Sequence, residues 1–222
     1  MSGEDAPTGY FSNGKFIPKR LADEIMQGHK FITLTDTEEI FFYNDGIYHP
    51  NADSIIKGEV KSMLCDGSNE HRANEVIFQI KASTYIDRNE INKHKNLIHL
   101  QNGIFDLETM ELKPFTPDSI STIQIPIEYN PKADCPKTKQ FLSEILPKDD
   151  RPIIQELFGY PLWKGYPIQK AFMFIGSGAN GKSTLMALLT RFLSQKNVSS
   201  VALQDFDMNR FATSCLYNKM AN

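Results

Sequence analysis

Residues 176–183, GSGANGKS, combine glycines, one lysine and one hydroxyl group at the spacing of a phosphate-binding loop. Glycines allow positive φ angles, so that several main-chain N–H groups converge on phosphate oxygens. The Lys182 ammonium would bridge the β- and γ-phosphates of a nucleotide, and the Ser183 hydroxyl would bind Mg²⁺, which prefers oxygen ligands. We therefore expect ATP and Mg²⁺ as cofactors, with Ser183 as the metal ligand. The expected binding residues are Gly176, Ser177, Gly178, Ala179, Asn180, Gly181, Lys182, Ser183 and Thr184.

The segments on either side of this loop have the order that a nucleotide-binding core requires. The apolar run Ala171–Ile175 predicts a buried strand of a parallel sheet. Residues 184–193 place Leu185, Leu188, Leu189 and Phe192 on one face, which predicts a helix packed on that sheet. The order strand, loop, helix favours a phosphate site over the alternative, a glycine-rich turn with an incidental lysine.

Hydrolysis of a nucleotide also needs an acidic strand that holds the metal. The segment VALQDFD, residues 201–207, offers Asp205 and Asp207, but its apolar run is short and Gln204 interrupts it, so we expect a surface turn. We expect the acidic strand to start near Met220 and to lie beyond the sequence, which would make the chain a truncated product or a fragment. On this interpretation it has no catalytic residues of its own, and nucleotide hydrolysis is not expected.

Composition limits the class of protein. The chain has 222 residues, of which 41% are hydrophobic and 23% charged, with a net charge of −3. These values predict a folded globular chain of one large or two small domains, without overall attraction for nucleic acid. Three distant cysteines argue against a zinc site or a disulfide framework. The absence of a long apolar run and of a signal peptide predicts a cytoplasmic protein without a membrane span.

Upstream of the loop, the pattern predicts an α+β domain. We expect a flexible tail over 1–14 and an α+β domain over 15–134. Residues 135–222 would form a short helical segment and an incomplete α/β P-loop core of the AAA+ type. The domain boundary is expected at the proline-rich residues 131–136. Expected helices are 18–28, 53–65, 70–84, 138–146 and 151–159, and expected strands lie in an antiparallel meander over 31–48, in hairpins from residue 97, and in an edge strand over 121–129.

The segments KAFMFIGSGANGKST and NVSSVALQDFDMNRFATSCLYNKMAN resemble the start of a superfamily 3 helicase core. Upstream, NGIFDLETMELKPFTPD, IPIEYNPKADCP, FLSEILP and IQELFGYPLW are similar to the domain that precedes this core. The likeness is to the primase–helicases of phages, plasmids and archaeal viruses, which are related to the poxvirus primase–helicase. It covers most of residues 15–222.

This resemblance implies the N-terminal portion of an ATP-dependent replicative DNA helicase from a virus, plasmid or integrated element. DNA would be its partner through the parent protein, and full-length relatives form homo-oligomers, usually hexamers. The family's Leu-x-Gly-Lys segment corresponds to Leu216–Lys219, with Asn218 in place of glycine. The alternative hypothesis is a non-enzymatic DNA-binding or protein-docking module in which the loop is a remnant.

Four other features are weighed against simpler explanations. We expect two basic stretches to be solvated faces rather than DNA contacts. In the first, between Lys81 and Lys95, carboxylates partly cancel the positive charge. The second, Lys15, Lys19 and Arg20, contains only a few charges. His99 lies in an apolar strand and is expected to be a core or rim histidine. Phe158, Tyr160 and Trp163 are expected to fill a core against a strand at Phe172, rather than to stack on bases.

Overall fold

The computed structural model describes residues 8–165 and 167–222, and the chain divides into two compact units. The first unit contains the residues up to Lys93 together with Thr116–Thr122, and the second contains His94–Phe115 and Ile123–Asn222. The predicted boundary near residue 134 stays a prediction. The described residues form a mixed α+β structure with three small sheets. No helix among them is both long and apolar enough to cross a bilayer.

The described chain starts with a small hairpin. Residues 1–7 of the predicted tail lie outside the described residues, whereas Thr8–Tyr10 form the 3-10 helix η1 and are followed by β1 (Phe11–Ser12) and β2 (Lys15–Phe16). The hydroxyl of Tyr10 donates a hydrogen bond to Glu24 at 2.7 Å. The range predicted as a flexible tail therefore includes a short 3-10 helix and the start of a hairpin from Thr8 onward.

The first unit contains a four-stranded sheet of order β5-β4-β3-β6. Strands β3 (Phe31–Leu34), β4 (Ile40–Asn44) and β5 (Ile47–His49) form the predicted antiparallel meander, and β6 (Tyr85–Ile86) joins β3 in parallel. The predicted helices are present as α1 (Pro18–Gly28), α2 (Ala52–Leu64) and α3 (Glu70–Thr84). Two 3-10 helices follow α2 and β6, η2 (Cys65–Gly67) and η3 (Arg88–Glu90).

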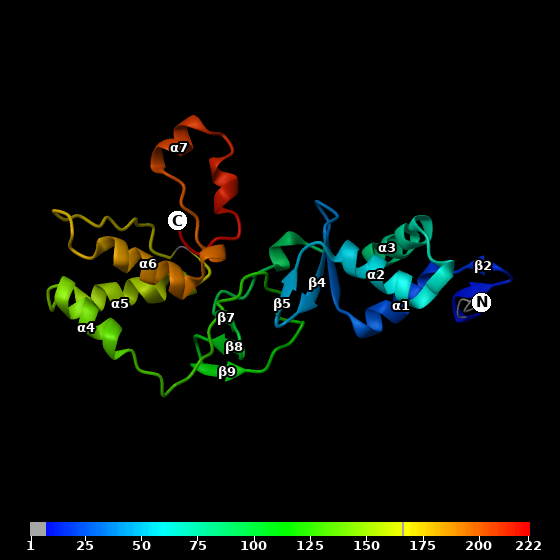
Figure 1. Ribbon diagram of the computed structural model, residues 1–222, viewed down its shortest axis with the longest axis horizontal. Coiled ribbons are helices and arrows are strands. Elements are labelled where there is room, and N and C mark those ends of the chain that lie inside the picture. Colours follow the sequence, from blue (N-terminus) through cyan, green and yellow to red (C-terminus); the bar gives the residue numbers. More distant parts are fainter. Residues whose placement is uncertain (1–7, 166) are drawn as a thin grey trace. The chain divides into compact units, whose positions relative to one another are not determined.

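Alternation along β3 and β4 gives this sheet two apolar faces. Phe31 and Ile40 belong to the core that contains α1, α2 and α3, and these helices lie together beside the sheet in Figure 1. Ile32 and Leu34 belong to a second cluster, against which Ile91 and Ile120 pack. Loop residues thus cover the second face of the sheet. The chain returns to the sheet at residues 116–122, where the main-chain N–H of Tyr48 donates a hydrogen bond to the carbonyl oxygen of Ser121 at 2.8 Å.

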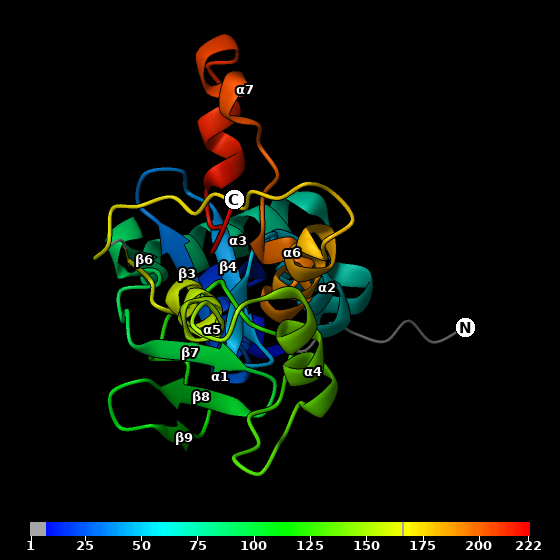
Figure 2. The same cartoon turned by 90° about the vertical axis from the view of Figure 1, so that its left-hand side faces the viewer.

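The second unit begins with the strands β7 (Leu97–Leu100), β8 (Gly103–Asp106) and β9 (Glu111–Lys113), which form the predicted antiparallel hairpins (Figure 2). Gly103 has φ +151°, and a Cβ there would lie 2.5 Å from the carbonyl oxygen of Lys113, so only glycine fits. The edge strand predicted over 121–129 is not formed. Two backbone hydrogen bonds, Ile125 N to His99 O and Gln101 N to Ile127 O, both 2.9 Å, hold this segment beside β7. Pro126 between them cannot donate to a ladder.

One buried carboxylate ties this meander together. Asp106 is 5% exposed and accepts hydrogen bonds from Lys113 Nζ at 2.6 Å, Glu108 N at 2.9 Å and Asn96 Nδ2 at 3.1 Å. The bond from Lys113, followed by that from Glu108 N, lowers the pKa of Asp106 from 3.8 to about 2. Three donors from three segments therefore hold the carboxylate in its charged form.

Three helices of the second unit pack around an apolar core of their own. They are α4 (Pro136–Ile145), α5 (Arg151–Gly159) and α6 (Lys182–Leu193), and proline occupies the first turn of α4 and α5, where no N–H bond is lost. Leu142, Ile154, Leu157 and Leu185 form the buried centre of this core. The 3-10 helix η4 (Tyr160–Leu162) follows α5 directly.

The final residues contain two short helical segments after the 3-10 helix η5 (Gln195–Asn197), namely α7 (Leu203–Met208) and the 3-10 helix η6 (Ala212–Leu216). Most of the segment VALQDFD is therefore helical, so the predicted surface turn is wrong. Its carboxylates do not end a buried strand, which agrees with the prediction that this segment is not the acidic strand of a nucleotide-binding core. Val198 and Ala221 form a parallel β-bridge, with Ser199 N donating to Ala221 O at 2.9 Å. The bridge is isolated, since Met220 forms a bend, so the acidic strand expected to start near Met220 stays a prediction.

Candidate nucleotide-binding loop

The segment before the loop differs from the prediction. Ala171–Ile175 is not a strand, and Met173 and Ile175 are 84% and 83% exposed. A strand of a parallel sheet needs a neighbour to receive its hydrogen bonds, and within the described residues no other strand lies beside this segment. Only Phe174 packs inward, against the core of α4, α5 and α6. The buried parallel strand is thus wrong for this structure, and the P-loop core is not established by it.

The loop itself is curled rather than extended. Gly178, Ala179 and Gly181 have φ angles of +99°, +47° and +83°, the left-handed region that glycine adopts without strain. Among the described residues, no hydrogen bond uses the main-chain N–H groups of residues 178–181. These donors remain available at an exposed turn, as a phosphate site requires.

The side chain of Lys182 folds back over this turn. Its Nζ donates to the carbonyl oxygen of Gly176 at 3.1 Å and to Oδ1 of Asn180 at 2.8 Å. A Cβ at Gly176 would lie 1.9 Å from Asn180 Nδ2, so the close approach of Asn180 requires glycine there. The ammonium is therefore held at the turn by neutral oxygens, which a phosphate would outcompete because charge-assisted hydrogen bonds are stronger.

Helix α6 places the loop at its N-terminus. Gly181 is the residue before the helix, and Leu185, 2% exposed, anchors the first turn in the core. A Cβ at Gly181 would lie 2.8 Å from Cγ2 of Ile145, so α4 packs directly against the turn. Sequence analysis missed Ile145, and only its helical spacing from Leu142 in the segment FLSEIL hinted at an inward side chain.

The metal ligand expected from the sequence lies next to Lys182. Ser183 and Thr184 are exposed in the first turn of α6. In the part of the chain that the structure describes, no group of three or more His, Cys, Asp or Glu side chains gathers to hold a metal. A single hydroxyl suits Mg²⁺ only when phosphate oxygens and water supply the other ligands. The donors present therefore fit a Mg²⁺–nucleotide rather than a bare cation.

The basic stretches weighed against DNA binding are largely neutralised. Lys81 lies 3.4 Å from Glu38, Arg88 lies 2.6 Å from Asp36, and Lys93 lies 3.1 Å from Glu90. The Arg88 guanidinium beside Asp36 also keeps the pKa of that carboxyl below its usual value. These pairings favour the solvated face that the sequence predicted.

In the second cluster, Lys19 pairs with Asp23 at 3.0 Å and Arg20 donates to Gly9 O. Both basic side chains thus already have partners on neighbouring residues of the same chain, which again favours a solvated face over a DNA contact.

Histidine and aromatic residues show one prediction confirmed and one partly wrong. His99 is 1% exposed in β7, so it is a core histidine. Phe158 packs in the helical core, with its ring 5.7 Å from that of Phe192. Trp163 and Phe172, however, are 37% and 49% exposed, because no strand forms at Phe172 to cover them.

Comparison with protein families decides the affiliation of the chain. A family model described as "D5 N terminal like" matches residues 19–147, more than half of the chain. The chain belongs to the D5 N terminal like family. The D5 N terminal like match indicates the N-terminal part of a primase–helicase-like replication protein, and it ends before the loop at 176–184. A comparison with curated proteins finds no match.

Proposed function

We propose that this chain is the N-terminal portion of a D5-type primase–helicase and that its loop at 176–184 binds ATP with Mg²⁺. The observation that carries the proposal is the turn before α6, where left-handed residues leave main-chain N–H groups without acceptors beside the ammonium of Lys182. Such a turn at a helix N-terminus stabilises anions. DNA and further copies of the chain are the partners proposed for the parent protein.

Each part of the loop has a separate task in this proposal. The N–H groups of residues 178–181 bind phosphate oxygens, and Lys182 leaves Asn180 to neutralise the terminal phosphates. Ser183 supplies one oxygen to Mg²⁺, which also neutralises phosphate charge when bound. Hydrolysis also needs an acidic strand to hold this ion and orient water, and the candidates Asp205 and Asp207 lie in the helix α7 rather than at the end of a strand, so we propose binding without hydrolysis.

The proposal is tested with a fluorescent ATP analogue and Mg²⁺. Replacing Lys182 by alanine removes the ammonium, and we expect binding at least tenfold weaker, because a charge-assisted bond to phosphate contributes roughly 1.5–3 kcal/mol. Lys148→Ala is the matched control, since Lys148 is an exposed lysine of the same unit outside the loop. Binding that is equally strong in wild type and Lys182→Ala would refute nucleotide binding by this loop.

A further inference from the structure

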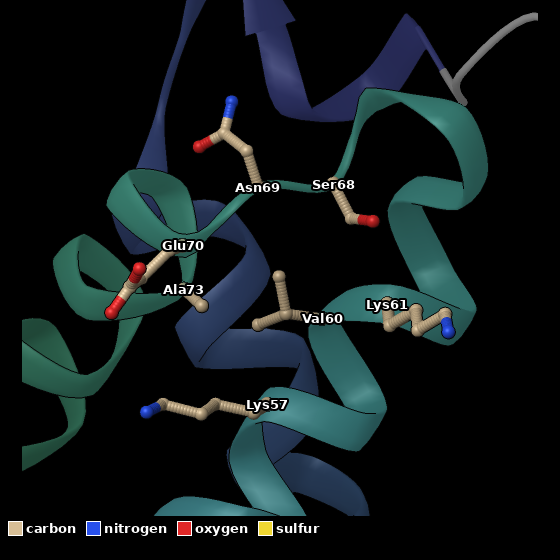
Figure 3. Close-up of a pocket in the computed structure, with 7 residues that line it drawn as sticks. All are labelled: Lys57, Val60, Lys61, Ser68, Asn69, Glu70 and Ala73. Carbon is tan, nitrogen blue, oxygen red and sulfur yellow. The ribbon is translucent and has the colours of Figure 1, made fainter.

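The two faces of the sheet in the first unit are covered in different ways. On one face, α1, α2 and α3 form a helical core, and Figure 3 shows Ala73 of α3 beside Val60 of α2 in this core. On the other face, Ile91 and Ile120 pack from loops. Ile120 lies in residues 116–122, which we call the strap. Whole helices thus close one face, whereas a short segment from later in the chain closes part of the other.

Both ends of the strap continue into the second unit. The strap itself belongs to the first unit, but Phe115 before it and Ile123 after it belong to the second. Only Ile123 and Gln124 lie between the strap and Ile125, whose main-chain N–H donates to His99 O of β7 at 2.9 Å. Ile125 is 1% exposed and is part of the second unit's own core. Release of the strap would therefore free the chain up to two residues before a buried anchor of the second unit.

Asn92 holds the strap by its main chain and its side chain. Its main-chain N–H donates to the carbonyl oxygen of Ile120 at 2.9 Å. Its Oδ1 accepts from Ser121 Oγ at 2.7 Å and from Thr122 N at 3.3 Å, and its Nδ2 donates to Thr122 Oγ1 at 3.2 Å. Asn92 has φ +55°, in the left-handed region that asparagine tolerates better than most residues. One residue of the first unit thus fixes three consecutive residues of the strap.

Tyr48 of β5 holds the strap from the sheet. Its main-chain N–H donates to Ser121 O at 2.8 Å, and its hydroxyl donates to Pro117 O at 3.0 Å. Ser121 is fully buried and Ser119 is 6% exposed, so the polar groups of the strap depend on partners within the protein. The strap therefore has one specific attached position, and leaving it breaks several hydrogen bonds at once.

We propose that the strap couples the stability of the two units. While the first unit is folded, the strap is fixed and limits the freedom of the connection between β9 and Ile125. When the first unit opens, that connection becomes a longer flexible loop, whose closure costs more conformational entropy, so the docking of Ile125 on β7 weakens. Coupling of this kind is reciprocal, so loosening Ile125 also favours release of the strap. The inference concerns the fold and does not rest on nucleotide binding by the loop at 176–184.

The test measures whether damage to the first unit reaches the second. Ile56→Ala destabilises the helical core on the face opposite the strap, since Ile56 is fully buried there. Unfolding of the second unit by urea is followed by the fluorescence of Trp163, the single tryptophan. In the otherwise unchanged chain, we expect Ile56→Ala to lower the urea midpoint of the Trp163 transition. In a chain that also carries Asn92→Gly, the same substitution should shift this midpoint much less.

The choice of glycine isolates the side-chain hydrogen bonds of Asn92. Glycine tolerates the positive φ of this position and keeps the main-chain N–H, so Asn92→Gly removes the side-chain bonds to the strap without strain. Asn51→Gly is the matched control, because Asn51 has φ +65° in the same unit and its side chain forms no hydrogen bond among the described residues. It also matches the entropy that glycine adds to the unfolded chain. We expect Asn51→Gly to leave the coupling intact.

Hydrogen exchange gives a second, local measurement. Asn92→Gly should speed the exchange of the Ile125 amide several-fold, although Ile125 belongs to the other unit, and Asn51→Gly should not. The proposal is overturned if Ile56→Ala leaves the Trp163 midpoint unchanged, or if it shifts this midpoint equally with and without Asn92→Gly. It is also overturned if the Ile125 amide exchanges at the wild-type rate in Asn92→Gly.

Discussion

Strand β3 in the first unit and residues 171–175 in the second are apolar segments of similar length in opposite environments. All four residues of β3 are buried, whereas Met173 and Ile175 are more than four-fifths exposed. Strand β3 hydrogen-bonds to β4 on one side and β6 on the other. Residues 171–175 have no strand beside them among the described residues. An apolar run thus becomes a buried strand only where neighbours accept its hydrogen bonds.

The largest effect is expected from shortening one side chain in each segment. Leu34→Ala empties space in a fully buried site, and we expect it to lower the free energy of unfolding by about 2–5 kcal/mol. Ile175→Ala should change it by less than about 0.5 kcal/mol, since the side chain is already in water. For Leu34→Ala, urea unfolding is followed by circular dichroism. For Ile175→Ala, it is followed by the fluorescence of Trp163, the single tryptophan. Equal losses for the two variants would show that residues 171–175 are buried in solution.

A smaller effect is expected where the loop meets its helical support. Gly178→Ala should cost about 1 kcal/mol, because alanine at φ +99° is strained although the space around it is open. Gly181→Ala should cost about 2 kcal/mol, since its Cβ would also press on Ile145. The same urea titrations of Trp163 fluorescence compare the two. A Gly181 variant as stable as the Gly178 variant would mean that α4 does not pack against the turn.

The most gradual effect concerns pH. The pKa of Asp106 is lowered from 3.8 to about 2, so its contribution to stability is complete above pH 3.8 and is lost as the pH falls toward 2. Asp106→Asn should remove this part of the acid dependence, and Lys113→Met should reduce it, because the Lys113 bond is the largest cause of the shift. Unfolding followed at several pH values between 5 and roughly 2 detects it. An unchanged acid dependence in Asp106→Asn would contradict the bond network seen around this carboxylate.

Local rules predicted most of the first unit well. Proline at the start of α1, the Asn44-Asp45-Gly46 turn between β4 and β5, and the apolar periodicity of α2 and α3 each act within a few residues. Prediction was weaker for residues 121–129, where Pro126 allows isolated hydrogen bonds to β7 without a continuous ladder. Coverage of the second sheet face by Ile120 was also missed, because that contact joins residues far apart in the chain.

For the candidate site, the sequence alone determined the residue types, which are glycines that permit positive φ, one lysine and one hydroxyl, and the helix that follows them, predicted from residue 184 and observed from Lys182. These are local properties, since φ preferences and helix starts depend on neighbouring residues. Only the tertiary structure decided that Lys182 is held by Gly176 and Asn180, that Ile145 supports Gly181, and that residues 171–175 stay exposed. Packing and strand pairing need partners from elsewhere in the chain, and the identity of a partner is not encoded in the segment that receives it.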